Sequence, residues 1–449
     1  MMNAAFIKSL QYGVLQNFEG ELRGVSIDSR KAKSANLFFA LLGENTDGHN
    51  FIPAARQNGA ALCCVNRNWF EQSPHDDGAF WIVEDTTLAL QKLAARWRQE
   101  FGIPILGITG TNGKTTCRSM IESVLKQRYD VHATTGNLNN QLGLPLTLLE
   151  LAPEHEISVL EMGTNHFGEI RSLCEIARPT VALITNIGHG HLEFFGSLEG
   201  VAQAKQEIFD ALPVDGLAFV NADDPHIAAM PTPENRITFA FRSGKVDFHG
   251  EILGYTDEGR CRLQVNDLML TLKIPGKTPA LNALPAVAVG KSFGVPDADI
   301  KNALENFAPV NQRFVIRNDG PCRIIDDSYN ANPDSTIAGL ESLLAIPVSG
   351  RRIFVMGDML ELGATAEAGH RRVGEKAVQM QIDYLLAHGP LSVFAIESAR
   401  QAGMPNAFHF PQKVDLIRRL RKILKPDDMI YVKGSRGIHM EEIINELRQ

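Results

Sequence analysis

Residues 107–116, with the sequence GITGTNGKTT, constrain the fold of this chain more than any other stretch. An apolar run at 103–106 precedes them and is typical of a buried strand, and apolar residues at helical spacing follow over 117–126. A strand, a glycine-rich loop and a helix in this order form the context of a phosphate-binding loop, whose amides and helix N-terminus attract phosphate. The stretch therefore predicts an ATP site, with a glycine-rich turn carrying a solvated lysine as the alternative.

The residue types inside this loop suit the chemistry of a nucleoside triphosphate. Lys114 can reach the terminal phosphates, and the hydroxyl of Thr115 can ligate magnesium. The usual pattern G-x-x-x-x-G-K-[ST] has a glycine where this chain has Ile108. The nucleotide-binding residues predicted from the loop are Gly110, Thr111, Asn112, Gly113, Lys114, Thr115 and Thr116.

Length and composition narrow the class of protein. A chain of 449 residues exceeds one ordinary core and predicts about two to four domains. A net charge of -8 argues against a nucleic-acid binder, and neither a membrane-length apolar run nor a signal pattern is visible. The six cysteines are scattered without C-x-x-C spacing, so we expect no zinc site and no disulfide framework. A cytoplasmic protein is the simplest expectation.

The pattern of apolar runs predicts three α/β domains. We expect a small α/β domain at 1–85, a central parallel-sheet domain with the phosphate loop at 86–309, and a Rossmann-like domain at 310–449. Within the central domain, 246–275 is predicted as an antiparallel excursion, and an alanine-rich helix follows from 282 to about 293. The strands predicted for the last domain are 323–325, 353–356, 384–387 and 429–432.

Polar residues follow several of these strands, where α/β folds bind their ligands. Glu161 ends the predicted strand 157–160 and is a candidate magnesium ligand. His189 and His191 follow the strand at 181–185; an exposed loop is the simpler interpretation for His189, and His191 stays unassigned on these grounds.

Two further polar segments follow strands of the last domain. Residues 326–333, DDSYNANP, offer donors and acceptors suited to a nucleotide, although an Asx-rich turn that caps a helix explains them as well. Residues 433–437, KGSRG, suit an anion site or a plain helix-capping turn.

Lys205 lies in a predicted helix with the sequence AKQEIF. Spacing alone favours a lysine on a solvated helical face. The functional alternative is a desolvated, neutral amine that adds carbon dioxide, because the resulting carbamate would be an anionic metal ligand.

Together these stretches resemble the Mur ligase family, ATP-dependent amide-forming enzymes of bacterial cell-wall synthesis. The resemblance covers essentially the whole chain and implies a three-domain α/β architecture. The motifs that carry it are TGTNGKTT (109–116), GNLNNQLGLP (136–145), EMGTNHFGEI (161–170), TNIGHGHLEFFGS (185–197), AKQEIF (204–209), DDSYNANP (326–333) and GDMLELG (357–363). Within the family they are most similar to the ligase that joins D-alanyl-D-alanine to UDP-N-acetylmuramoyl-tripeptide. The DNPR signature of the sister ligase that adds the third residue is missing.

The resemblance also implies roles for individual residues. Lys114, Glu161, His191 and Lys205 would form the catalytic group, and Thr115, Glu161, His191 and a carbamylated Lys205 would hold magnesium. The ATP contacts of the family fall on Asn282, Arg313, Asp327, Tyr329 and Asn332. The substrate positions are Asp28, Ser29, Arg30, Gly48 and His49 for the UDP end, Asn139 and Asn140 in the central cleft, and Lys433, Ser435 and Arg436 for the amine or peptide.

The chain departs from the family pattern at two places. The family usually reads PGRHNxxNALAA where residues 275–285 read PGKTPALNALP, and Gln312 stands where a glycine normally precedes Arg313. The rival functions are another Mur-type or folylpolyglutamate ligase, a P-loop ATPase without ligase activity, and a non-catalytic protein of the same fold. We expect a monomer that binds small-molecule substrates, with no nucleic-acid partner and no membrane insertion.

Overall fold

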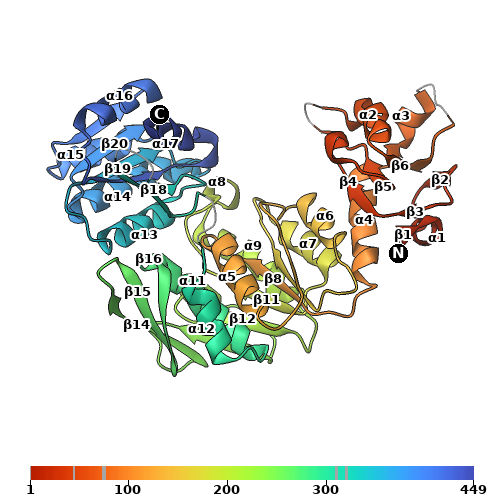
Figure 1. Ribbon diagram of the computed structural model, residues 1–449, viewed down its shortest axis with the longest axis horizontal. Helices are drawn as coiled ribbons and strands as arrows, with labels where there is room; N and C mark the ends of the chain where they lie inside the picture. Colours follow the sequence, from red (N-terminus) through yellow and green to blue (C-terminus); the bar gives the residue numbers. More distant parts are fainter. Residues whose placement is uncertain (1, 44–45, 73–76, 309–311, 319–321, 449) are drawn as a thin grey trace.

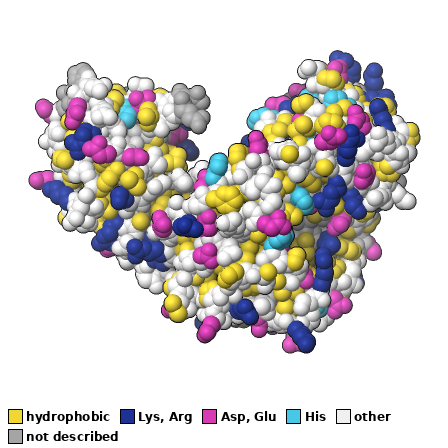
Figure 2. Space-filling model, turned by 180° about the vertical axis from the view of Figure 1, so that it is seen from behind, with side chains coloured by type: hydrophobic (Ala, Val, Ile, Leu, Met, Phe, Trp, Pro, Cys, Tyr) yellow, Lys and Arg dark blue, Asp and Glu magenta, His cyan; other side chains and the backbone are white. Residues whose placement is uncertain are grey.

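The computed structural model describes residues 2–43, 46–72, 77–308, 312–318 and 322–448. Three α/β units follow one another along the chain, and the first and third stand apart on either side of the central one (Figure 1). Seen from behind, the surface is hollowed between the first unit and the rest of the molecule (Figure 2). The domain boundary predicted at 309/310 lies outside the described residues.

The first unit is a small α/β layer around one sheet. Its five strands run in the order β2-β7-β6-β5-β4 and are parallel except for the pair β2–β7. The strands are β2 (Val14–Gln16), β4 (Gly24–Ser26), β5 (Asn36–Phe39), β6 (Ala60–Asn66) and β7 (Phe80–Val83), with β1 (Met2–Asn3) paired to β3 (Glu21–Leu22). The helices are α1 (Ala4–Ser9), α2 (Ile52–Gln57) and α3 (Arg67–Gln72).

Tryptophan side chains anchor the first unit and its junction with the central one. Trp81 is 1% exposed, packs edge-on against Phe39 and donates its indole N–H to the Tyr12 carbonyl. Trp97, on helix α4 (Thr86–Arg98), packs edge-on against Phe6. Trp81 is buried and Trp97 is half-buried, and both large rings add apolar contact area to the core of this small unit and to its junction with the central one.

The central unit is built on a sheet of nine strands in the order β16-β15-β14-β13-β12-β11-β8-β10-β9. The strands are β8 (Ile105–Thr109), β9 (Val131–Ala133), β10 (Ile157–Glu161), β11 (Val181–Ile184), β12 (Leu217–Asn221), β13 (Arg236–Ala240), β14 (Phe248–Tyr255), β15 (Arg260–Val265) and β16 (Leu268–Pro275). The helices after α4 are α5 (Lys114–Leu125), α6 (Gly143–Leu148), α7 (Glu169–Ala177), α8 (Leu192–Phe195), α9 (Leu198–Asp210), α10 (Pro225–Ala228), α11 (Thr278–Ser292) and α12 (Asp297–Glu305).

The pairing pattern of this sheet confirms the sequence interpretation. Strands β8 to β13 are parallel, and β14, β15 and β16 form the predicted antiparallel excursion. Every residue of β8, β10 and β11 is buried, as expected for parallel strands covered by helices on both faces. In register, Glu161 lies opposite Ile108, and Ile184 lies opposite Thr109. The polar residues that follow these strands therefore meet at one edge of the sheet, beside the phosphate loop.

The third unit is a second, mostly parallel sheet in the order β17-β18-β22-β19-β20-β21. Its strands are β17 (Val315–Arg317), β18 (Arg323–Asp327), β19 (Arg352–Gly357), β20 (Tyr384–His388), β21 (Ala407–Phe410) and β22 (Met429–Lys433). Its helices are α13 (Pro333–Leu344), α14 (Ala366–Gln379), α15 (Val393–Gln401), α16 (Lys413–Ile423) and α17 (Glu441–Arg448). All four predicted strands are confirmed. No helix in the described part of the chain has the length and apolar character needed to span a membrane.

Candidate nucleotide-binding cleft

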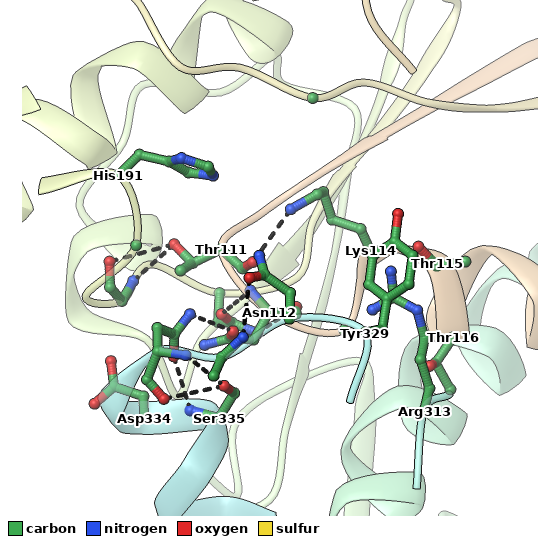
Figure 3. A pocket seen from close by; sticks show the side chains of 18 of the residues that line it. Thr111, Asn112, Lys114, Thr115, Thr116, His191, Arg313, Tyr329, Asp334 and Ser335 are labelled. Atoms are coloured by element: carbon green, nitrogen blue, oxygen red, sulfur yellow. Dashed lines mark hydrogen bonds between the residues drawn. The ribbon is translucent and has the colours of Figure 1, made fainter. Parts of the chain in front are cut away.

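A cavity of about 900 Å³ lies between the central and third units and gathers most of the predicted site residues. The phosphate loop forms one wall, and residues that follow β18, among them Tyr329 and Asp334, lie beside it (Figure 3). The segment that follows β22 also lines the cavity. The predicted residues that line it are Thr111, Asn112, Gly113, Lys114, Thr115, Thr116, Asn139, Asn140, Glu161, His191, Asn282, Arg313, Asp327, Tyr329, Asn332, Lys433, Ser435 and Arg436. Residues more than 300 positions apart in the sequence thus face one space.

Two loop positions require glycine. Gly110 has φ +146°, and a Cβ there would lie 1.9 Å from Thr185 Oγ1. Gly113 has φ +81°, and a Cβ there would lie 2.4 Å from the Asn282 side-chain oxygen. Any larger residue would displace the loop from β11 or from α11, so the glycines let the backbone itself form the cavity wall.

Lys114 begins helix α5 and turns its amine back over the loop. Its Nζ donates to the Gly110 carbonyl at 2.7 Å and to the Thr111 carbonyl at 3.1 Å. Burial lowers the pKa of Lys114, and the nearby Glu161 carboxylate partly opposes that effect. The amine is thus held at the cavity by weak acceptors that an anionic ligand can replace.

Glu161 ends β10 with one carboxylate oxygen left without a hydrogen bond. Glu161 is 2% exposed, and its Oε1 accepts a hydrogen bond from Asn139 Nδ2 at 2.8 Å. Oε2 has no hydrogen-bond partner within the described residues, and Arg118 Nε lies 3.8 Å away. The arginine is too far away to donate a hydrogen bond, so a buried carboxylate oxygen at the cavity keeps its lone pairs available, and this donor fits a magnesium ion.

The described residues contain no group of three or more His, Cys, Asp or Glu side chains arranged for a metal ion. Any cation beside Glu161 would therefore depend on other oxygens, such as the Thr115 hydroxyl and phosphate. Magnesium is usually bound in this way, with few protein ligands.

Lys205 is buried, and the expectation of a solvated helical face is wrong. The residue is 2% exposed, and within the described part of the chain its amine has neither a hydrogen bond nor an ion pair. Burial, with repulsion from Lys114, sets the pKa of Lys205 well below its usual value, which favours the neutral amine. Helical spacing held the signal for this burial, because Lys205 lies four residues from both Val201 and Phe209, which are buried.

The third unit contributes a cluster of charged and aromatic groups. The Arg313 guanidinium stacks on the Tyr329 ring at 4.1 Å from its centroid. Asp327 Oδ2 accepts hydrogen bonds from Tyr431 at 2.8 Å and from Lys433 Nζ at 2.6 Å. Lys433 is 4% exposed and also donates to the Asn330 carbonyl, so its amine supports Asp327 rather than projecting freely into the cavity.

Asn332 joins the two walls while it caps a helix. Its side-chain oxygen accepts from Ser335 N at the start of α13, in a capping box. Its amide nitrogen donates to the Asn112 side chain at 2.8 Å, across the cavity. The prediction of an Asx-rich helix cap is confirmed here, and the same residue also contacts the phosphate loop.

The predicted UDP-site residues lie in the first unit, outside this cavity. The Arg30 guanidinium donates hydrogen bonds to the Asp28 carboxylate and lowers the pKa of that carboxyl to about 2. His49 is buried, contacts Asp47 and stacks on Trp69 with ring centroids 4.8 Å apart. Ser29 and Gly48 belong to short 3-10 helices that Asp28 and Asp47 cap. These residues form two preformed turns that follow β4 and β5.

The sequence interpretation gave no functional role to Glu361, which lines the cavity, or to His189, which contacts the cavity residue Asp334. His189, expected as an exposed loop residue, bonds Asp334 Oδ2 through its backbone N–H and its Nδ1, both at 2.8 Å. Glu361, in GDMLELG, lies at the cavity with Oε2 2.7 Å from His191 Nδ1, and this contact lowers the pKa of Glu361. The motif GDMLELG begins at the last residue of β19, and this position at the end of a strand could have indicated that Glu361 lies near a binding site.

The two departures from the family pattern have structural consequences. Gln312 adopts φ +58°, a left-handed conformation that explains why glycine is usual there. The atypical stretch contacts the third unit: Lys277 Nζ lies 3.5 Å from Glu341, and the Thr278 and Ser342 hydroxyl oxygens are 3.2 Å apart.

Comparison with known proteins agrees with this architecture. The profiles of three Mur ligase regions match in order: the Mur ligase family, catalytic domain, at 21–98, the Mur ligase middle domain at 108–290, and the Mur ligase, glutamate ligase domain, at 312–436. These regions cover most of the chain, and the chain belongs to the Mur ligase family.

Two curated relatives and two solved structures illustrate the similarity, and each match covers at least 95% of this chain. UDP-N-acetylmuramoyl-tripeptide–D-alanyl-D-alanine ligases of Bacillus subtilis and Escherichia coli are 36% and 38% identical, over 98% and 97% of this chain and 97% and 96% of theirs. The crystal structure of MurF from Acinetobacter baumannii has a TM-score of 0.89 at 31% identity, covering 99% of this chain and 98% of that chain. MurF from Thermotoga maritima, solved in complex with ADP, has a TM-score of 0.82 at 28% identity, covering 95% and 97%.

Proposed function

We propose that this chain joins D-alanyl-D-alanine to UDP-N-acetylmuramoyl-tripeptide at the expense of ATP, to give the pentapeptide precursor of peptidoglycan. The observation that carries the proposal is the cavity in which a phosphate loop, a buried Glu161 oxygen without a hydrogen bond from the described residues, and the Arg313–Tyr329 stack face one another. The names of relatives that match almost the whole chain support the choice of substrates.

Each unit is proposed to hold one part of the reaction. Unit 1–85 takes the UDP end of the substrate on the turns of Asp28, Ser29, Arg30, Gly48 and His49. Unit 86–309 takes the phosphates of ATP, and Asn139 and Asn140 face the peptide. Unit 310–449 takes the remainder of the nucleotide through Arg313, Asp327, Tyr329 and Asn332, with Asn282 opposite. The same unit offers Lys433, Ser435 and Arg436 to the amine or peptide. We place the reaction in the bacterial cytoplasm, performed by a monomer.

Magnesium fits the donor set of this cavity. Thr115 and Glu161 would hold one ion, and His191 with a carbamylated Lys205 would hold a second. Bound magnesium supplies positive charge that neutralises the phosphates. Lys205 suits carbamylation because its amine is buried, has a pKa that burial lowers, and has no acidic partner in the described residues; a carbamate there would offset the charge of Lys114.

The residues of the cavity account for the ligation reaction by position and charge. The carboxylate at the peptide terminus attacks the γ-phosphate of ATP and forms an acyl phosphate with release of ADP. The amine of D-alanyl-D-alanine then attacks the acyl carbon, and the tetrahedral intermediate expels phosphate to leave the amide. Lys114 and the loop amides stabilise charge on the transferring phosphoryl group, so no covalent enzyme nucleophile is needed.

Phosphate release tests this function directly. The protein is mixed with ATP, magnesium and UDP-N-acetylmuramoyl-tripeptide, with and without D-alanyl-D-alanine, and products are separated by mass. We expect sustained phosphate release only with both substrates, together with a pentapeptide product. Release that ignores the dipeptide would instead identify an ATPase without ligase activity, and release that needs another amine would identify a different Mur-type or folylpolyglutamate ligase.

A further inference from the structure

GDMLELG carries a charged residue that the proposed mechanism does not use. Glu361 belongs to the third unit, whereas His191 belongs to the central unit, yet Glu361 Oε2 lies 2.7 Å from His191 Nδ1. The Nδ1 atom is shielded from solvent, while the His191 side chain as a whole is 26% exposed. The exposed part of the ring therefore faces the cavity, as Figure 3 shows, where the ring points to the side on which Lys114 lies.

Both partners are held in unfavourable backbone conformations. His191 has φ +57° and Glu361 has φ +61°, left-handed values that are uncommon for residues other than glycine. A backbone bond from Glu193 N to the Glu361 carbonyl, at 3.2 Å, joins the two turns across the interface. Two such turns facing each other place these side chains together at a cost in backbone energy, and such a cost is typical of functional sites.

The turn that carries Glu361 is fixed within its own unit. Asp358 accepts from Ser392 N at 2.7 Å, Met359 N donates to His370 Nε2 at 3.0 Å, and Leu360 N donates to Ser435 Oγ at 2.9 Å. Glu361 therefore reaches His191 only while the third unit is docked on the central one.

The ring chemistry of histidine links this contact to the cavity. A neutral histidine whose Nδ1–H faces a carboxylate keeps the lone pair of Nε2 free for a metal ion, and the carboxylate fixes the ring orientation. The distance from His191 Nδ1 to Glu361 Oε2 is that of a hydrogen bond, but the angles are not those of a hydrogen bond. Hydrogen bonds of catalytic sites commonly become aligned when substrates bind.

We propose that Glu361 is a positioning residue for His191, which presents Nε2 to a divalent cation at the cavity only when the third unit is docked. The proposal rests on the proposed function, because that function gives His191 its role as a ligand. Docking of the third unit then completes the metal site as well as the nucleotide site.

A second interdomain ion pair provides a matched control. Lys277 and Glu341 also join the central and third units, at 3.5 Å, but Glu341 does not line the cavity. Glu361→Gln and Glu341→Gln each remove one carboxylate charge from the same interface. Only the first changes the group that faces His191.

The test measures binding of Mn²⁺ to the full chain with a non-hydrolysable ATP analogue, by the paramagnetic resonance signal of free Mn²⁺. We expect Glu361→Ala to weaken the Mn²⁺ binding about 10- to 100-fold and Glu361→Gln to weaken it less, since the amide oxygen can still accept from Nδ1–H. Glu341→Gln is expected to stay within about twofold of wild type. In turnover, the Mg²⁺ concentration needed for half-maximal rate should rise for Glu361→Ala, with little change in the KM for D-alanyl-D-alanine.

Equal Mn²⁺ affinity of Glu361→Ala and wild type would overturn the proposal. An equal loss of Mn²⁺ affinity in Glu361→Gln and Glu341→Gln would also overturn it, because it would indicate a general docking contact between the units. Unfolding temperatures identify a misfolded alanine variant, in which case Glu361→Gln, with nearly the same shape, decides. Failure of the wild-type chain to form the pentapeptide would refute the proposed function, whereas normal ligation with unchanged Mn²⁺ binding in the variants would refute the positioning role alone.

Discussion

Replacing Lys114 with alanine is expected to lower ligase turnover about 10³-fold or more, while the protein remains folded. The amine is the cation that the phosphate loop places at the cavity, and charge stabilisation supplies most of the catalysis in phosphoryl transfer. In the structure the same amine makes only two hydrogen bonds, to loop carbonyls, so its loss should cost about 1 kcal/mol of stability. Single-turnover rates and thermal unfolding measure the two effects separately.

Lys126 provides the control for this variant. It lies just after the C-terminal end of the same helix, is exposed and pairs with Glu122 at 2.7 Å. Lys126→Ala removes the same charge from α5 and is expected to leave turnover within about twofold, because exposed ion pairs contribute little. Near-normal turnover of Lys114→Ala would show that the phosphate-loop assignment is wrong.

Replacing Lys205 with methionine is expected to lower ligase turnover about 10²-fold or more, without loss of stability. The amine is buried with no acidic partner in the described residues, and burying such a polar group is unfavourable, so an apolar side chain of similar shape should not lower the stability of the protein. If the neutral amine carries a carbamate, methionine also removes one anionic ligand of a magnesium ion. Turnover should therefore fall, while the unfolding temperature should rise or stay constant.

Lys205→Ala distinguishes the carbamate from a simple packing role. It leaves a space in which formate or acetate can take the place of the carbamate oxygens, so these anions should partly restore turnover in this variant and not in Lys205→Met. Gln203→Met, on the exposed side of the same helix, should behave as wild type. Full activity of Lys205→Met would contradict any role for a carbamate at this position.

The strands and the phosphate loop could be predicted because their signals are local. Four apolar residues in a row, followed by glycines and a lysine, fix strand, loop and helix over about 20 residues, and the structure departs only at the ends. Helix α5 begins at Lys114 rather than Cys117 because its first turn is polar and adds nothing to the apolar period. Helix α11 likewise begins at Thr278 rather than Asn282.

The parts that could not be predicted depend on docking between distant segments. The approach of Glu361 to His191 spans 170 positions and needs both left-handed turns, and no spacing rule relates them. Lys433 was expected to face substrate, whereas its partnership with Asp327 follows from the parallel pairing of β18 with β22. The resemblance to the Mur ligases supplied the positions of such residues, and the structure supplied what each of them contacts.

The placement of the tryptophans makes the first unit optically distinct. The chain has three, and Trp69, Trp81 and Trp97 all lie in the first unit or on the helix that leaves it. Selective tryptophan emission therefore reports on the first unit and on its junction with the central one, whereas circular dichroism averages over all three sheets. His49 stacks on Trp69 within a predicted nucleotide-binding turn, so quenching of that emission gives a direct signal for the uridine end of the substrate, separate from any event at the ATP cavity.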